Sequence, residues 1–228
     1  MSSFHTLDKL ESLRYGVYLP PDHSEAEEPW PILCFLHGSR ECGCPSDTRE
    51  QTEALLTSHG PLKNGTPRGG ANDFIVILLQ VPCDRCEDPR SFNDNWVNHA
   101  GTVVQIVEAV QDNFNGDTER TYLTGFSYGG NGVLDIGSKP RDVWAALWAV
   151  DPTRVPETGL KRPVWLSAGP YAARQKTAFE DVFDVREVQN NPSADFVYSF
   201  AHPEHPIAAR EAYATSEIYR WLLSKRLS

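Results

Sequence analysis

A serine with a glycine two positions away on each side most strongly limits how this chain can fold. The motif G-F-S-Y-G at 125–129 follows a segment, RTYLTG at 120–125, that predicts a strand, and precedes a small-residue segment, 130–138, that predicts a helix. In a sharp strand-to-helix turn the central residue is strained, and its neighbours two positions away have no room for side chains. The motif therefore predicts a turn that lifts the Ser127 hydroxyl clear of a sheet, at the positive end of a helix. The simpler alternative is a glycine-rich turn with an incidental serine.

Short apolar runs alternate with helical patterns along the rest of the chain. Continuous apolar runs such as 32–36 and 74–81 are typical of strands buried on both faces of a parallel sheet. Strands that alternate with helices indicate an α/β fold. The predicted strands are 13–20, 32–36, 74–81, 120–125, 143–150, 163–168 and 195–200, and the predicted helices are 46–58 (with Asp47 and Glu50 spaced as a capping box), 103–114, 130–138 and 212–225.

The length of the chain, 228 residues, fits one domain over residues 1–228. A chain of this size buries roughly 70–75% of the surface that its unfolded form exposes, so neither disulfides nor a metal are needed for stability. The segment 59–73, rich in Gly, Pro and Asn, is expected to be a long loop within this domain.

Charge and hydropathy exclude several classes of partner. Asp and Glu number 31 against 21 Lys and Arg, a formal net charge of −10, whereas nucleic acids and anionic membranes are bound by clustered cations. No run approaches the ~20 apolar residues of a membrane-spanning helix. The first residues lack the ~7–15-residue apolar stretch of a signal peptide. The expected location is therefore the cytoplasm, with no nucleic acid as partner and no membrane insertion.

Backbone donors near Ser127 are predicted by a second motif. His37-Gly38-Ser39 follows the predicted buried strand 32–36. Attack of a serine on a carbonyl needs N–H groups that point at the oxyanion formed. The N–H groups of Ser39 and Tyr128 are the candidates for this oxyanion hole. The alternative for the His37 motif is a simple turn after a strand.

A general base is expected late in the chain. His202 and His205 follow the last predicted strand and precede the closing helix. A serine followed by a histidine near the C-terminus is the chain order of hydrolases built on a parallel sheet with a serine turn of this kind. At least one of the two histidines is expected to be an ordinary loop residue.

Taken together, these segments resemble the α/β-hydrolases, in particular the small carboxylesterase/phospholipase group with the acyl-protein thioesterases and bacterial "predicted peptidase" esterases. PILCFLHGSRECG at 31–43 resembles that group's PLLLFLHGAGERG, and RTYLTGFSYGGNG at 120–132 resembles its RIYLTGLSMGGYG. HPIAAREAYATSEIYRWLLSKR at 205–226 resembles its closing H-x-x-W-x-x-AY…LYDWLLSQKR segment. This last similarity favours His205 over His202 as the base.

The resemblance implies an α/β-hydrolase fold with about seven or eight mostly parallel strands and helices on both faces. A chain of 228 residues leaves no room in this fold for a large inserted cap. In that group, the loop around Trp96 lines the substrate cleft, together with the backbone turn at His37 and Gly38. The alternative for Trp96 is an exposed loop tryptophan.

The acid of the expected triad is missing from its usual place. In the similar family it lies in a segment like HGxxDxxV, whereas this chain has AGPYAA at 168–173, without a carboxylate. Asp151, at the end of the preceding predicted strand, is the leading substitute, although Asp-Pro pairs also begin ordinary turns. Asp181, Asp184 and Asp195 are weaker candidates.

Two other interpretations of the missing acid stay open. A Ser–His dyad could work slowly, with a carbonyl to orient the base, since the acid fixes the imidazole tautomer and stabilises the imidazolium. Alternatively, the chain could be a degenerate hydrolase that only binds a ligand.

Four cysteines follow two strands that are expected to be neighbours. Cys42 and Cys44 follow the strand 32–36, and Cys83 and Cys86 follow the strand 74–81. Their thiols could stay free, join the two loops as disulfides, or form a tetrahedral Cys₄ zinc site. A cytoplasmic location favours free thiols. Cys34, within a strand, is expected in the core.

The sequence thus predicts a serine hydrolase that cleaves a carboxylic ester or thioester of a small molecule. Ser127 would form an acyl-enzyme, with His205 as base and Asp151 as the candidate acid. No organic cofactor is implied, and the oligomeric state is not indicated. The alternative is a binding protein without catalysis on the same fold, because fold alone does not determine function.

Overall fold

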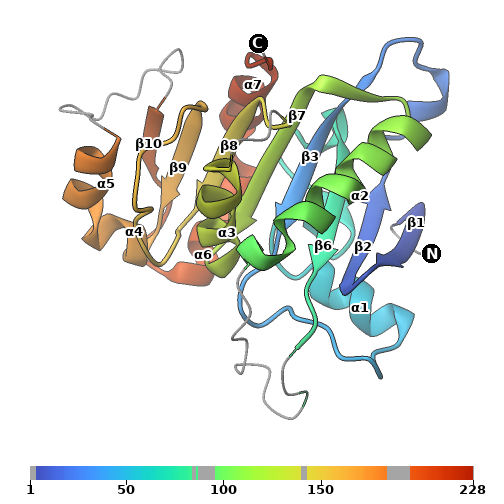
Figure 1. The fold of residues 1–228 in the computed structure, drawn as a ribbon, viewed down its shortest axis with the longest axis horizontal. Coiled ribbons are helices and arrows are strands. Elements are labelled where there is room, and N and C mark those ends of the chain that lie inside the picture. The colour runs from blue at the N-terminus through green and yellow to red at the C-terminus, as the bar shows by residue number, and fades with distance from the viewer. Residues whose placement is uncertain (1–3, 84–85, 87–95, 140–142, 184–195, 228) are drawn as a thin grey trace.

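An eight-stranded sheet forms the centre of the molecule (Figure 1). The computed structural model describes residues 4–83, 86, 96–139, 143–183 and 196–227. The strands lie in the order β1-β2-β6-β3-β7-β8-β9-β10, and β2 is antiparallel to both its neighbours while the other pairs are parallel. Their bounds are β1 Thr6–Leu10, β2 Leu13–Tyr18, β3 Trp30–Leu36, β6 Ile75–Gln80, β7 Gly116–Phe126, β8 Ala146–Val150, β9 Val164–Ala168 and β10 Phe196–Phe200. The predicted mostly parallel sheet is confirmed.

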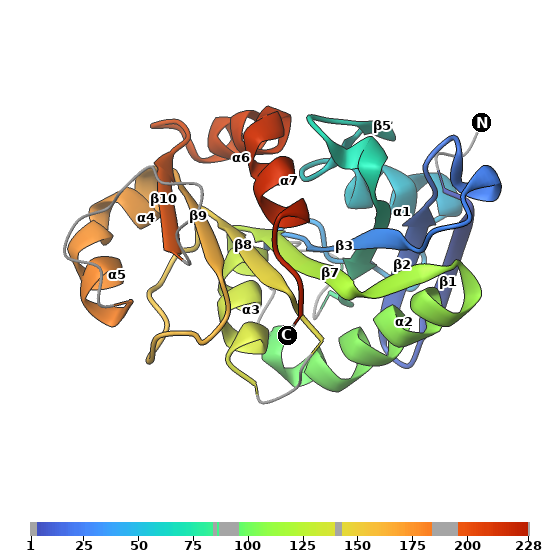
Figure 2. The ribbon, with the colours of Figure 1, turned by 90° about the horizontal axis from the view of Figure 1, so that it is seen from above.

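Helices cover both faces of this sheet, as Figure 2 shows from above. Helices α2 (Ala100–Asn113) and α3 (Tyr128–Gly137) pack on one face, and α1 (Arg49–Leu56), α6 (His205–Ala214) and α7 (Ser216–Leu223) lie on the other. Every residue of β6 and β8 is buried between the two layers. Continuous apolar strands result from this burial, since both faces of each strand need apolar side chains.

Several short elements were not predicted. Strand β1 pairs with β2 at the edge, and a two-stranded hairpin, β4 (Leu62–Lys63) and β5 (Thr66–Pro67), lies within the segment expected to be a loop. Two short helices, α4 (Pro170–Arg174) and α5 (Lys176–Val182), follow β9. None of these carries a long periodic pattern, which is the signal on which prediction depends.

Two predicted helix boundaries were wrong. The closing helix 212–225 is two helices, because Thr215 has extended backbone angles and separates α6 from α7. The capping box of α1 is formed by Thr48 and Gln51, each of which bonds the other's backbone N–H. Asp47 instead accepts a hydrogen bond from the Cys44 N–H at 2.6 Å.

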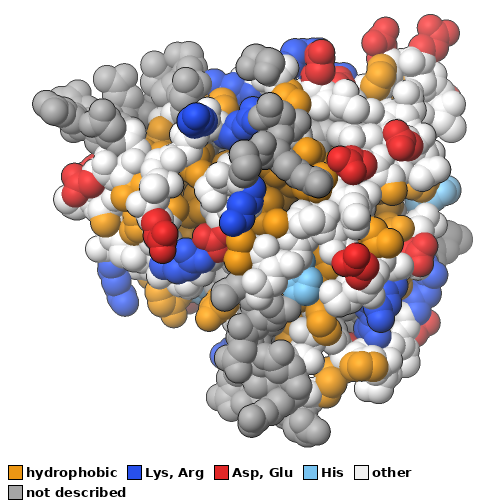
Figure 3. Space-filling view, in the orientation of Figure 1, with side chains coloured by type: hydrophobic (Ala, Val, Ile, Leu, Met, Phe, Trp, Pro, Cys, Tyr) orange, Lys and Arg blue, Asp and Glu red, His pale blue; other side chains and the backbone are white. Residues whose placement is uncertain are grey.

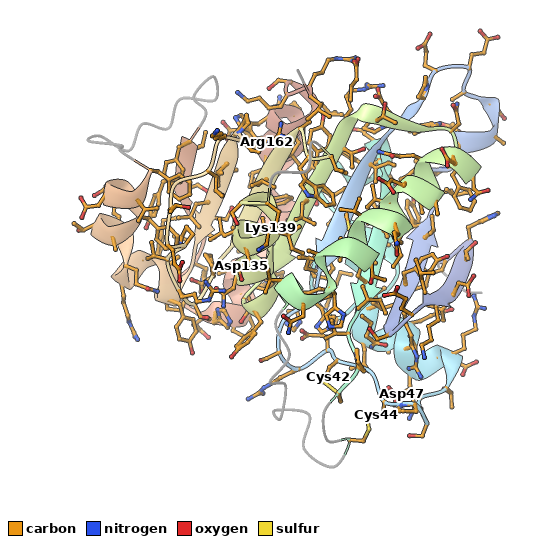
Figure 4. All side chains as sticks on the ribbon, in the orientation of Figure 1. Cys42, Cys44, Asp47, Asp135, Lys139 and Arg162 are labelled. Atoms are coloured by element: carbon orange, nitrogen blue, oxygen red, sulfur yellow. A yellow bond between two sulfur atoms is a disulfide. The ribbon has the colours of Figure 1, made fainter. Side chains whose placement is uncertain are left out.

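The four loop cysteines form two disulfides, Cys42–Cys83 and Cys44–Cys86, so the expectation of free thiols is wrong. Their Cα atoms are 5.0 and 5.7 Å apart, which suits disulfide geometry. The pairing follows from the sheet, because β3 lies beside β6 and a further backbone β-bridge joins Gly43, between Cys42 and Cys44, to Pro82, directly before Cys83. Figure 4 shows Cys42 and Cys44 together at this edge.

The remaining cysteine, Cys34, is free and buried in β3, and burial raises the pKa of its thiol. Among the residues that the structure describes, no group of three or more His, Cys, Asp or Glu side chains could hold a metal ion. Within the same ranges, none of the helices combines the length and apolar character needed to cross a bilayer.

We expect thiol titration to show this pairing. Unfolded, unreduced protein should react with about one equivalent of Ellman's reagent, and reduced protein with about five, because only Cys34 is unpaired among five cysteines. The Cys34→Ser variant is the control and should lose the single equivalent. Five reactive thiols before reduction would contradict the two disulfides.

Candidate active site

Ser127 lies at the turn from β7 into α3 with φ 59° and ψ −116°, as the glycine motif predicts. Its N–H bonds the Val150 carbonyl at 2.9 Å, which attaches the turn to β8. A Cβ on Gly129 would collide with the Leu36 carbonyl, and one on Gly125 would collide with the Gly129 carbonyl. Both glycines are therefore required by close backbone contact, and the strained serine is held from two strands.

A chain of hydrogen bonds joins Ser127 to a histidine and an aspartate. Nε2 of His205 is 2.9 Å from the Ser127 Oγ, and Nδ1 of the same ring is 2.5 Å from Oδ2 of Asp151. Asp151 is fully buried, whereas the His205 side chain is 23% exposed. With Nδ1–H donated to the carboxylate, Nε2 is free to accept the Ser127 proton.

Asp151 is anchored by the helix that takes the place of the usual acid segment. Its Oδ1 accepts hydrogen bonds from the N–H groups of Tyr171 (3.1 Å) and Ala172 (2.8 Å), in the first turn of α4. A Cβ on Gly169 would collide with Oδ2 of Asp151, so the glycine retained before α4 makes room for this carboxylate. Both oxygens of Asp151 are therefore held, one by the backbone and one by His205.

The competing candidates lie elsewhere. Asp181 is exposed on α5, and Asp184 and Asp195 lie outside the described residues. Nδ1 of His202 accepts the backbone N–H of Glu204 at 3.1 Å. Of the two late histidines, it is His205, the first residue of α6, that contacts Ser127.

Ser127 opens into a cleft of about 500 Å³. Gly38, Ser39 and Tyr128, all expected near the reacting group, line this cleft. The rings of Phe126 and Tyr171 both contact His205, with centroids 4.5 and 4.7 Å from that of the imidazole. Sequence reasoning did not single out the other residues of the cleft, because a motif such as the one that contains Phe126 predicts the backbone turn and not which side chains face the cleft. These residues are Arg40, Glu41, His59, Phe126, Thr153, Tyr171 and Pro206.

Two residues expected in the cleft, His37 and Trp96, are buried beneath it instead. His37 donates Nδ1–H to the Gly38 carbonyl at 2.5 Å, and its Nε2 accepts the Val81 N–H at 3.1 Å. Trp96 donates its indole N–H to the His37 carbonyl at 3.2 Å. These bonds tie the turn before Ser39 to the end of β6, so both side chains support the cleft from below.

The arrangement can activate a hydroxyl next to a cleft for attack on an acyl carbon. It has a serine hydroxyl that lines the cleft, an imidazole in contact with that hydroxyl, and a buried carboxylate hydrogen-bonded to the imidazole.

Comparison with known families gives this geometry a context. Residues 11–197 match the model of the Esterase family, described as "Putative esterase". The chain belongs to this esterase family. The match spans the strands that carry Ser127 and Asp151 and confirms the expected esterase-type enzyme, and a search of curated proteins finds no match.

Solved structures of esterases have the same fold as this member of the family. A thermostable esterase superposes with a TM-score of 0.67 and 16% identity, over 97% of this chain and 62% of the other. This chain thus spans less than two thirds of that esterase. FphF, a fluorophosphonate-binding serine hydrolase of Staphylococcus aureus, superposes with a TM-score of 0.63 and 13% identity, over 95% of this chain and 96% of FphF. A ferulic acid esterase of Anaeromyces mucronatus superposes with a TM-score of 0.60 and 14% identity, over 96% of this chain and 90% of that esterase. The predicted α/β-hydrolase fold is confirmed.

The burial of His37 predicts a pH dependence of stability. Burial lowers the pKa of His37 below its ordinary value of about 6.5, more than the charge of Glu41 and the bond to Gly38 raise it. Below pH 6.5 the unfolded chain therefore binds a proton that the folded protein does not. The free energy of unfolding should fall as the pH drops from about 6.5, by at most ~1.4 kcal/mol per pH unit from this group.

Urea denaturation at a series of pH values measures this effect. His37→Gln should flatten the slope below pH 6.5, whereas His202→Gln, at a partly exposed position, should leave it unchanged. Equal slopes for His37→Gln and the original protein would contradict the assignment.

The contacts of Asp151 predict that it orients the base. Asp151→Asn should lower kcat for 4-nitrophenyl acetate by about 10³- to 10⁴-fold, because an amide N–H cannot accept the Nδ1–H of His205 and favours the wrong tautomer. Asp181→Asn, on the exposed face of α5, is the matched control and should retain activity. A loss of less than tenfold, with an unchanged thermal unfolding midpoint, would favour a Ser–His dyad.

Proposed function

We propose that this esterase cleaves carboxylic esters or thioesters through an acyl-enzyme on Ser127. The observation that carries the proposal is the continuous hydrogen-bonded chain from Ser127 through His205 to the buried Asp151. Family membership supports an ester as the substrate. The cleft volume of about 500 Å³ suits a small-molecule ester.

In the first half-reaction, Ser127 Oγ attacks the acyl carbon while its proton passes to Nε2 of His205. Asp151 accepts the Nδ1–H and stabilises the imidazolium that forms. The N–H groups of Ser39 and Tyr128, both at the cleft wall, would hold the oxyanion. His205 then gives its proton to the leaving oxygen or sulfur, and the acyl group stays on Ser127.

In the second half-reaction, water attacks the acyl-enzyme. His205 takes a proton from the water, and collapse of the tetrahedral intermediate returns that proton to Ser127 and releases the carboxylic acid. No organic cofactor enters either step.

The disulfides bear on where this chemistry takes place. Thiols are kept reduced in the cytosol of most organisms, so Cys42–Cys83 and Cys44–Cys86 favour an oxidising compartment over the expected cytoplasm. The expectation of free thiols follows from the expected cytoplasmic location, so the two disulfides count against that location.

Labelling with a fluorophosphonate probe tests the proposed nucleophile. The original protein should be labelled at Ser127, because the probe reacts with serines activated by a base. Ser127→Ala should abolish the label and His205→Ala should reduce it at least about 100-fold, consistent with the contribution of a general base.

His202→Ala is the matched control and should be labelled like the original protein. The opposite result, folded protein without label or without esterase activity, would favour the alternative of a binding protein on the same fold.

A further inference from the structure

A second cavity adjoins the catalytic cleft. It has a volume of about 300 Å³, and His59 and Pro206 line both spaces. Its walls come from the segment after α1, the β4–β5 hairpin and the first turns of α6, which lie side by side in Figure 2. The lining residues are Ser58, His59, Gly60, Lys63, Arg68, Pro206, Ile207 and Arg210.

The lining of this cavity is cationic, although the protein as a whole is acidic. Four of the eight lining residues are Lys, Arg or His, in a chain with a net charge of −10. On the face seen in Figure 3, by contrast, Lys and Arg side chains lie among Asp and Glu side chains. The average composition of the chain does not explain why cationic side chains cluster at this cavity.

Two of these cations have only neutral partners. Lys63 Nζ donates to the Ser58 carbonyl, and Arg68 donates to the Arg210 carbonyl at 3.4 Å. Among the described residues, neither side chain has an ion-pair partner. Arg210 differs, because it pairs with Glu211 at the exposed surface. Lys63 and Arg68 therefore bring uncompensated positive charge and spare N–H donors to the cavity wall.

His59 is held at the junction of the two spaces by a buried carboxylate. Its Nδ1 lies 2.9 Å from Oε1 of Glu41, whose side chain is 8% exposed. Burial acts to raise the pKa of Glu41, but the bond to His59 and the charges of His37 and His59 outweigh it, so the pKa is lowered. Because His59 is already bonded to the Glu41 carboxylate, anion binding is left to Lys63 and Arg68.

The position of the cavity beside His205 identifies which part of an ester it receives. His205 protonates the leaving atom, so the leaving group must lie on the His205 side of Ser127. Pro206 and Ile207, the next two residues of α6, form part of the cavity wall. The alcohol or thiol portion of the substrate is thus directed toward this cavity.

We propose that the cavity binds a carboxylate on the leaving group of the ester, through Lys63 and Arg68. The substrate class is then an ester or thioester whose alcohol or thiol part is itself a carboxylic acid. The guanidinium of Arg68 offers the planar fork that suits a carboxylate, and Lys63 adds a second charge. The inference rests on the proposed ester hydrolysis at Ser127.

Matched pairs of esters test the inference. The probes are the acetate esters of 4-hydroxybenzoate, 4-hydroxyphenylacetate and 3-(4-hydroxyphenyl)propanoate, each beside the corresponding primary amide. At one or more spacer lengths, kcat/KM should favour the carboxylate over the amide by roughly tenfold, as charged hydrogen bonds do. Lys63→Gln and Arg68→Gln should each reduce this ratio severalfold, because the loss in kcat/KM should be larger for the carboxylate ester than for its amide partner.

Two controls separate the cavity from general charge effects. Lys176→Gln, on α5 with an ion pair to Glu180, makes the same change in net charge and should leave the ratio unchanged. Phenyl hemisuccinate beside phenyl succinamate places the carboxylate on the acyl side instead, and this pair should show no preference that depends on Lys63 or Arg68.

A ratio near one at every spacer length, or a ratio that both variants leave intact, would overturn the cavity assignment. A preference confined to the acyl-side pair would do the same. In these cases hydrolysis of the amide-bearing esters shows that the proposed function still stands. If no ester is cleaved and the fluorophosphonate probe does not label Ser127, the proposed function fails, and the cavity assignment fails with it.

Discussion

The contact between the backbone of Gly129 and the carbonyl of Leu36 is the constraint on which the rest of the site depends. It lets the turn after β7 pass directly against the end of β3, so the nucleophile and the loop with Gly38 and Ser39 meet at one edge. The neighbouring strand β8 ends at Val150, which accepts the Ser127 N–H, and its next residue is Asp151. Parallel strands thus deliver successive functional groups to the same edge, as open α/β sheets generally do.

Much of this arrangement could be predicted from local rules. Steric need explains the glycines around Ser127, and the position of His205 after the last strand follows from chain order. The sequence ranks Asp151 first among the candidate acids but does not single it out. Its carboxylate is held by the N–H groups of Tyr171 and Ala172, which belong to a helix too short to leave a periodic pattern in the sequence. Four cysteines allow three pairings, and the register that selects one is a tertiary property.

The burial of Trp96 and His37 shows a different limit of sequence reasoning. Both residues follow strands of the sheet at the edge that carries Ser127. A side chain at that position can line the cleft or lie beneath it. The choice is made by packing, since Gly132 leaves room for Trp96 against α3, and His37 finds partners for both ring nitrogens within the backbone. Polar side chains that are fully paired in this way belong to the support of a site more often than to its surface.

The same loop links this support to the cationic cavity. Glu41 lies between His37 and the two disulfide-bonded cysteines that follow it, and it reaches across to His59 at the junction of the two spaces. A net charge of −10 acts weakly there, because exposed charges beyond about 10 Å are largely screened at 0.1 M salt. Lys63 and Arg68 are only partly exposed and are screened less, so an acidic protein can still present a locally positive site to an anionic leaving group.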